Sequence, residues 1–116
     1  MAIPDDIRQR LCTLIRAKKY VLGHWKNGTP HCWRPGQVRN AEGEFCAPHE
    51  AWQIVLSLLE TNGMWVTVLL EQPAGEYGYE VVTSLCDGEP KTYVKIQLSK
   101  PGTHVIGRSF HPSNRE

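Results

Sequence analysis

The spacing of hydrophobic residues predicts two helices. Residues 4–19 open with Pro4 and two aspartates and carry an apolar stripe at helical spacing: Ile7, Leu11, Leu14 and Ile15. A second helix is predicted from Ala47-Pro48 to a stop at Asn62-Gly63, with a wider apolar face: Ala51, Trp52, Ile54, Val55, Leu58 and Leu59.

After the second helix the hydrophobic period changes to two. Four candidate strands follow, at residues 64–71, 77–85, 91–98 and 103–110. The connections between them are short and rich in proline and glycine, which favours an antiparallel meander. The expected fold class is therefore α+β: a single domain, residues 1–116, with two helices packed on one face of a four-stranded antiparallel sheet.

Residues 20–36, between the helices, are harder to assign. Asn27-Gly28 is a strong hairpin signal, whereas Pro30 and Pro35 restrict any strand here to an edge or an irregular loop. We expect a possible hairpin, followed by a loop over residues 36–46.

Composition places the chain among globular proteins, with 41% hydrophobic and 22% charged residues in 116. No apolar run approaches the ~20 residues of a spanning helix, so no membrane association is expected. The N-terminus does not read as a signal peptide, and a cytoplasmic location with four reduced cysteines is the expectation.

Charge is divided unevenly along the chain. Residues 1–40 hold eight Lys and Arg against two Asp, a net charge of +6, and residues 41–90 hold nine acidic residues and no Lys or Arg. Residues 91–116 hold five Lys and Arg against one Glu, a net charge of +4. If the two basic ends meet in the fold, they form a positive patch suited to a polyanion such as RNA; the alternative is that they lie apart.

The last predicted hairpin carries the candidate chemistry. In the third strand, alternation places Tyr93, Lys95 and Gln97 on the face away from the helices. In the last strand the alternation is broken near Gly107, which could mark a bulge. The pattern leaves open whether Arg108 or His111 joins the first three, and a bulge would admit both.

These residue types suit a reaction in which negative charge grows on a phosphate. Cleavage of RNA by its own 2′-hydroxyl needs a base, a cation and an acid, and no metal or cofactor. Histidine suits acid–base work near neutrality, which makes His111 the candidate for proton transfer. Lys95 and Arg108 can hold phosphate charge, and Tyr93 can stack on a base or pass a proton.

The pattern YVKIQL, a short turn and HVIGRSFH, within residues 92–111, resembles the last two strands of the MqsR family of toxin ribonucleases, part of the wider RelE-like toxin group. The resemblance covers about a sixth of the chain. It implies a RelE-like architecture and a metal-independent mRNA endonuclease of a toxin–antitoxin system, with a cognate antitoxin protein as partner. Tyr93 falls at the family's functional tyrosine. His111 follows Ser-Phe, where well-known members carry a catalytic lysine, and this departure leaves the acid–base assignment open.

Further residues are candidates for RNA contact. Interleaved aromatic and basic side chains can clamp a single strand, and the N-terminal segment offers such a set: Trp25, Lys26, Trp33, Arg34 and Arg39. Gln97 and Ser109 are the candidates from the C-terminal hairpin. The alternative for the two tryptophans is that they cover the sheet edge.

A metal site is the competing interpretation of a second cluster. Five possible zinc ligands lie within twenty-six residues: His24, His31, Cys32, Cys46 and His49. No Cys-x-x-Cys pair is present, so we expect loop and core residues rather than zinc.

Two alternatives to a ribonuclease also remain: a non-catalytic nucleic-acid-binding regulatory module, and a protein-interaction domain such as an immunity or adaptor protein that uses the acidic middle segment.

Overall fold

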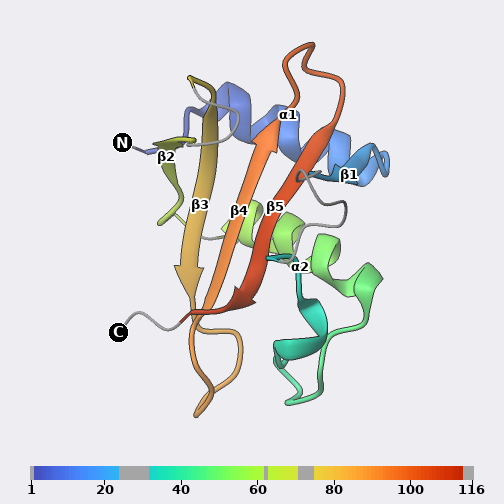
Figure 1. The fold of residues 1–116 in the computed structure, drawn as a ribbon, viewed down its shortest axis with the longest axis vertical. Coiled ribbons are helices and arrows are strands. Elements are labelled where there is room, and N and C mark those ends of the chain that lie inside the picture. The colour runs from blue at the N-terminus through green and yellow to red at the C-terminus, as the bar shows by residue number, and fades with distance from the viewer. Residues whose placement is uncertain (1, 24–31, 62, 71–74, 114–116) are drawn as a thin grey trace.

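The computed structural model describes residues 2–23, 32–61, 63–70 and 75–113. Two helices lie on one side of a five-stranded sheet, and the other face of the sheet carries no helix (Figure 1). We call this second face the open face. In chain order the elements are α1 (Asp5–Arg16), β1 (Tyr20–Leu22), the 3₁₀ helix η1 (Pro35–Gln37), α2 (Pro48–Thr61), β2 (Val66–Leu69), β3 (Tyr77–Thr83), β4 (Thr92–Leu98) and β5 (Val105–Pro112).

Both predicted helices are confirmed, and their apolar faces form the core. α1 buries Leu11, Cys12, Leu14 and Ile15, and α2 buries Ala51, Trp52, Val55, Leu58 and Leu59. Trp65, in the connection to β2, is almost fully buried, and its Nε1 donates to the carbonyl oxygen of Leu58 at 3.0 Å. The indole therefore ties the end of α2 to the sheet.

The sheet corrects one part of the prediction. Strands β2 to β5 form the expected antiparallel meander, but a fifth strand makes the sheet mixed, with the order β1-β5-β4-β3-β2. β1 runs parallel to β5, with Tyr20 opposite Val105 and Leu22 opposite Gly107. A strand of three residues shows no readable period, and its partner lies far along the chain, so no local pattern signals the pairing.

The segment predicted as a hairpin pairs with β5 at two places. Next to β1, the Gly23 amide donates to the carbonyl oxygen of Gly107 at 2.9 Å. Further along, the Phe110 amide donates to Cys32 at 2.8 Å and the Arg34 amide donates to Phe110 at 2.6 Å. The two described arms run parallel to β5, one after the other, so they do not pair with each other as the expected hairpin would; the predicted Asn27-Gly28 turn lies outside the described residues.

A column of four aromatic rings joins this edge to α2. The Trp33 ring lies 5.5 Å from that of Phe110 and 4.9 Å from that of Trp52, and Tyr20 stacks on Trp52 at 4.4 Å with an interplanar angle of 14°. This packing gives Trp33 the edge-covering role that was the alternative to RNA contact. Within the described residues, no helix has the length and apolar character needed to cross a membrane.

The column requires a glycine at position 107. A Cβ atom there would lie 2.7–3.0 Å from three carbons of the Trp33 ring, which packs against Phe110 and Trp52 and has no room to retreat. We expect Gly107→Ala to lower the free energy of unfolding by about 1–3 kcal/mol in urea titration, because overpacking a core shifts side chains and backbone. Gly36→Ala is the matched control, since a Cβ at position 36 meets no atom within 4 Å. Equal stability of the two variants would contradict this account.

Candidate active site on the open face

A β-bulge in β5 decides which side chains reach the open face. Lys95 pairs with Ser109, and the next residue, Ile96, pairs with Gly107, so Arg108 is an extra residue in β5. The insertion reverses the alternation of side chains along the strand. The open face, which already holds Tyr93, Lys95 and Gln97, therefore gains Arg108, Ser109 and His111. The other residues of β5 at this point face the helices: Val105, Gly107 and Phe110. The bulge admits both Arg108 and His111.

Tyr93, His111 and Glu80 form the first cluster of the open face. Tyr93 and His111 are direct partners across β4 and β5, with ring centroids 5.3 Å apart in an edge-on arrangement. The Tyr93 hydroxyl donates to Oε2 of Glu80 at 2.6 Å, across from β3. A histidine, a phenol and a carboxylate thus stand in line over three adjacent strands.

The His111 ring has a defined tautomer when it is neutral. Its Nδ1 lies 2.8 Å from the carbonyl oxygen of Pro112, and a carbonyl oxygen only accepts, so Nδ1 carries a hydrogen. Nε2 then carries the lone pair of the neutral ring. A hydrogen bond of this kind also orients the ring, which general acid–base catalysis requires.

Arg108 is held by a second polar cluster. Its Nε and Nη2 donate to Oε1 of Gln97 at 3.0 and 2.6 Å, and Nε2 of Gln97 donates to Oε1 of Glu76 at 3.2 Å. Gln97 is only 2% exposed, which gives it the role of a support beneath the arginine. Burial lowers the pKa of the Arg108 guanidinium, and the charge of Glu76 opposes that shift.

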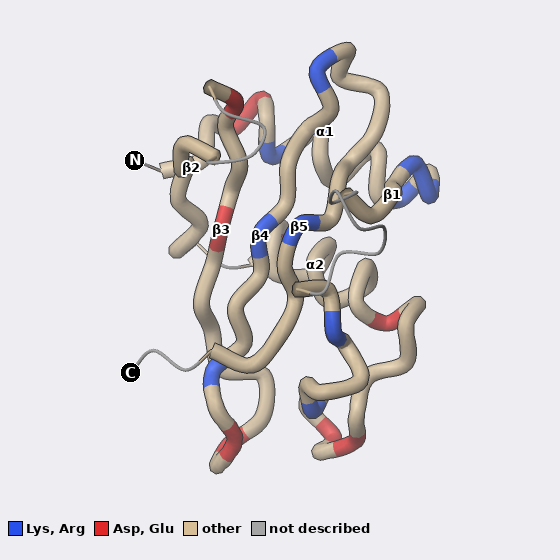
Figure 2. Tube along the Cα trace, in the orientation of Figure 1, with Lys and Arg blue, Asp and Glu red and all other residues tan. Residues whose placement is uncertain are grey.

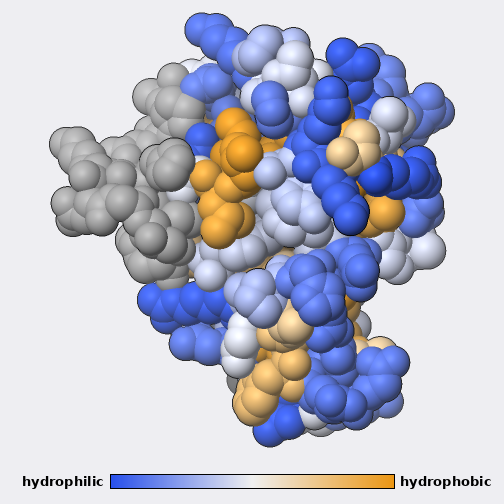
Figure 3. All heavy atoms as spheres, turned by 90° about the vertical axis from the view of Figure 1, so that its right-hand side faces the viewer, coloured by the Kyte–Doolittle hydropathy of each residue, from blue (hydrophilic) through white to orange (hydrophobic). Residues whose placement is uncertain are grey.

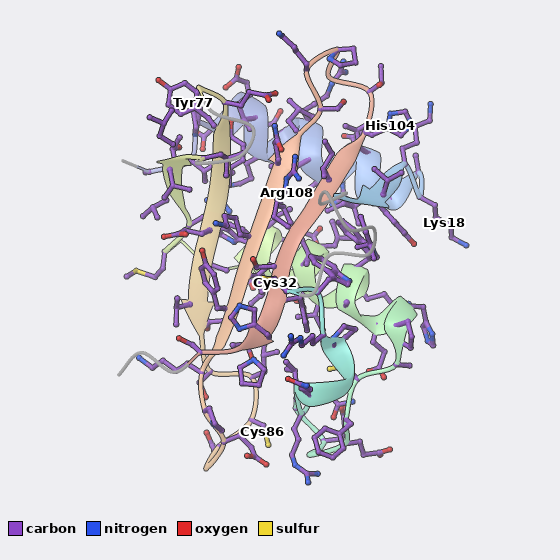
Figure 4. The ribbon with its side chains drawn as sticks, in the orientation of Figure 1. Lys18, Cys32, Tyr77, Cys86, His104 and Arg108 are labelled. Atoms are coloured by element: carbon purple, nitrogen blue, oxygen red, sulfur yellow. The ribbon has the colours of Figure 1, made fainter. Side chains whose placement is uncertain are left out.

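Gly23 fixes the other side of the guanidinium. A Cβ atom at residue 23 would lie 2.4 Å from Nη1 of Arg108 and 3.2 Å from its Cδ, so the arginine packs directly against backbone at the end of β1. Figure 4 shows Arg108 over the open face beside β4 and β5. The bulge, Gln97 and Gly23 together position one cation on the sheet.

Lys95 lies between the two clusters. It pairs with Glu80 of β3 on one side and with Ser109 of β5 on the other. Its Nζ is 5.8 Å from the centre of the Tyr93 ring, within reach of a cation–π contact. Figure 2 shows the resulting row, with basic segments of β4 and β5 beside an acidic segment of β3. Ser109 is buried between its neighbours.

The carboxylates of Glu76 and Glu80 were missed by sequence reasoning, which assumed a face poor in acids. A signal existed for Glu80, because it alternates with Tyr79 and Val81, whose side chains are buried. The same alternation that selected Tyr93 in β4 therefore places Glu80 on the open face. Glu76 precedes β3, where no strand period could place it.

The remaining RNA-contact candidates are dispersed. Arg34 is exposed, and its amide donates to the carbonyl oxygen of Phe110, so its backbone lies along the β5 edge of the sheet. Arg39 is engaged elsewhere, with its Nε 2.7 Å from Glu89 and its guanidinium 4.1 Å from the centre of the Phe45 ring. Trp25 and Lys26 lie outside the described residues.

The described residues bring no three potential metal ligands together. Cys46 is buried, and burial, with a smaller effect of Glu50, raises the pKa of its thiol, which disfavours the thiolate that zinc binds. His24 and His31 lie outside the described residues. All four cysteines are free thiols.

The two basic ends of the chain do meet. β1 lies along β5, and the Val105 amide donates to the carbonyl oxygen of Lys19 at 2.9 Å. The N-terminal basic segment and the strand that carries Arg108 are therefore neighbours at one edge of the sheet. This juxtaposition is the one that a positive patch requires, although Glu76 and Glu80 offset part of the charge on the open face.

Comparison with protein-family models, with curated proteins and with solved structures finds no match to this chain. Its function has to be argued from the site itself.

The support of Arg108 by Gln97 is testable without knowledge of the activity. We expect Gln97→Met to lower the free energy of unfolding by about 1–3 kcal/mol, because it leaves the Arg108 guanidinium and Glu76 without a buried partner. A double-mutant cycle with Arg108→Met, followed by urea unfolding, should show that the two losses are not additive. Gln37→Met, at an exposed position, is the control. Additive losses would show that the hydrogen bonds contribute little.

Proposed function

We propose that this protein is a metal-independent endoribonuclease of the toxin type that cleaves mRNA on the open face of its sheet. The observation that carries the proposal is the bulge at Arg108. It brings Arg108 and His111 onto the face that already holds Lys95 and the Tyr93–Glu80 pair. These are the groups that an attack by a 2′-hydroxyl on the adjacent phosphate requires.

The reaction assigns each group a step. Glu80, acting through the Tyr93 hydroxyl that it holds at 2.6 Å, takes the proton of the 2′-hydroxyl as its oxygen forms a bond to phosphorus. The bond from phosphorus to the 5′-oxygen breaks, and protonated Nε2 of His111 donates its proton to that oxygen. The products are a 2′,3′-cyclic phosphate and a free 5′-hydroxyl, so atoms and charge balance.

Lys95 and Arg108 stabilise the charge that develops on the phosphorane. They approach from adjacent strands, and Gln97 and Gly23 fix the guanidinium before substrate arrives. Positioned charges of this kind contribute more in the transition state than flexible ones, because no reorganisation is needed. Arg34, whose amide bonds to Phe110 of β5, is our candidate for holding the next phosphate of the RNA strand.

The resemblance of residues 92–111 to MqsR-type toxins supplies the context. A cytoplasmic ribonuclease of this type needs a cognate antitoxin that blocks the open face until RNA cleavage is required. Single-stranded RNA is the substrate that fits, because bases must be unstacked to lie against a flat sheet and contact the half-buried ring of Tyr93.

The proposal predicts RNA cleavage that continues in EDTA and is lost in His111→Ala. We expect the rate to fall about 10²–10⁴-fold, the usual contribution of a general acid. The assay follows an unstructured RNA on a denaturing gel, with detection of 2′,3′-cyclic phosphate ends. His104→Ala is the matched control, since His104 is exposed in the turn before β5.

Three outcomes separate the functions. Cleavage by His104→Ala but not by His111→Ala supports the ribonuclease. Salt-sensitive RNA binding that neither substitution alters, without cleavage, indicates the regulatory module instead. Absence of both RNA binding and cleavage would refute the proposal and favour a protein-interaction domain.

Glu80→Gln tests the other half of the proton transfer. An amide oxygen still accepts the Tyr93 hydroxyl, so the fold should keep its stability, but the group no longer takes a proton. We expect the cleavage rate to fall about 10²-fold or more in single-turnover measurements. Glu89→Gln, which affects only the ion pair with Arg39, should cleave as the parent does. Full activity of Glu80→Gln would restrict Glu80 to a structural role.

A further inference from the structure

A second hollow lies on the helix side of the molecule, away from the open face. It has a volume of about 380 Å³, and it sits between the end of α1 and the first half of α2. Figure 3 views the molecule from the edge at which β1 lies and shows several hydrophobic areas among hydrophilic side chains. The lining residues are Ile15, Arg16, Lys18, Tyr20, His49, Trp52, Gln53 and Leu56. The ribonuclease proposal uses none of them.

The inner wall of this pocket is aromatic. Tyr20 and Trp52 line it as a nearly parallel pair, with centroids 4.4 Å apart, and they end the column that begins at Phe110 in the core. Ile15 and Leu56 add apolar surface beside them. Tyr20 and Trp33 cover the Trp52 ring, which is only 5% exposed, so the half-buried Tyr20 is the ring on which an aromatic ligand can stack. Gln53 offers an amide that could donate to and accept from the edge of such a ring.

The rim of the pocket carries positive charge. Arg16 pairs with Glu60, so its charge is partly balanced. Lys18 has no ion-pair partner among the described residues, and it projects from the molecular edge in Figure 4. His49, in the first turn of α2, faces the same space. The C-terminus of α1 carries negative partial charge, and the amides of Ala17, Lys18 and Lys19 bind three of its carbonyl oxygens.

The backbone at Lys18 supplies an independent observation. Its φ is +58°, and within the described ranges it is the one non-glycine residue with a positive φ. Glycine is the residue that this position after a helix favours, because it has no Cβ to strain. Strained backbone conformations cluster at functional sites, and Lys18 combines such a conformation with a positive charge at a pocket.

We propose that this pocket binds a nucleotide. The base stacks on Tyr20, the last ring of the column, and the phosphate is bound by Lys18 and His49. The ligand is either a free mononucleotide or the 5′-phosphorylated end of an RNA chain, which present the same chemistry. The site is separate from the open face, since Tyr20 faces the helices whereas its neighbour Val21 is exposed. The inference does not depend on the ribonuclease.

The experiment measures binding to the intact chain by titration calorimetry. The probes are AMP, GMP, CMP and UMP, with adenosine and inorganic phosphate as partial ligands. We expect at least one mononucleotide to bind at least tenfold more tightly than adenosine or inorganic phosphate, since only the nucleotide uses both the wall and the rim. Lys18→Gln should weaken binding about tenfold, the loss expected for one charge-assisted contact of about 1.4 kcal/mol. Lys19→Gln is the matched control, because Lys19 is the next residue, is exposed and does not line the pocket.

Lys18→Gly separates function from folding. The substitution relieves the strained φ, so the Tm should equal or exceed that of the parent while nucleotide binding falls. Two short 2′-O-methyl oligonucleotides, with and without a 5′-phosphate, distinguish the two sources of ligand. Tighter binding of the phosphorylated form assigns the site to RNA ends, and binding of mononucleotides alone assigns it to free nucleotides. Equal weakening by Lys18→Gln and Lys19→Gln, phosphate binding as tight as nucleotide binding, or no binding at millimolar concentration would each overturn the proposal.

Discussion

The candidate site depends on the close packing of Trp33 against β5 where residue 107 has no side chain. The indole lies in the space that a Cβ would take, and it is held from the other side by Trp52. The bulge at Arg108 follows immediately in the chain. Because packing holds Gly107 on the helix side, the extra residue of the bulge, Arg108, lies on the opposite face, as does His111.

Much of the fold was readable from the sequence, for physical reasons that are specific to each element. The helices show a clear apolar stripe because one side of each packs on the sheet, and strands β2 to β5 alternate because one face is open to solvent. β1 was not readable, since it has three residues and pairs with a strand near the other end of the chain. The sequence near β1 does not indicate that it pairs with β5, because the pairing depends on residues far along the chain.

The site was predicted in part. Regular alternation in β4 correctly places Tyr93 and Lys95 side by side on the open face. The break in the alternation of β5 was visible at Gly107. Which side chains reach the open face depends on which residue is the extra one in the bulge, and the packing of Trp33 on Gly107 keeps residue 107 on the helix side. Glu80 was not predicted, although the same alternation rule places it on the open face.

The parallel pairing of β1 with β5 also has a consequence for the order of folding. It joins residues 20–22 to residues 105–107, so it closes a loop that includes most of the chain. Closing so long a loop is slow and comes after local contacts have formed. During synthesis the helices and the first strands emerge well before β5. Arg108 gains its place against Gly23 only when β5 is added, so a nascent chain acquires its complete open face only after residues 105–112 have emerged.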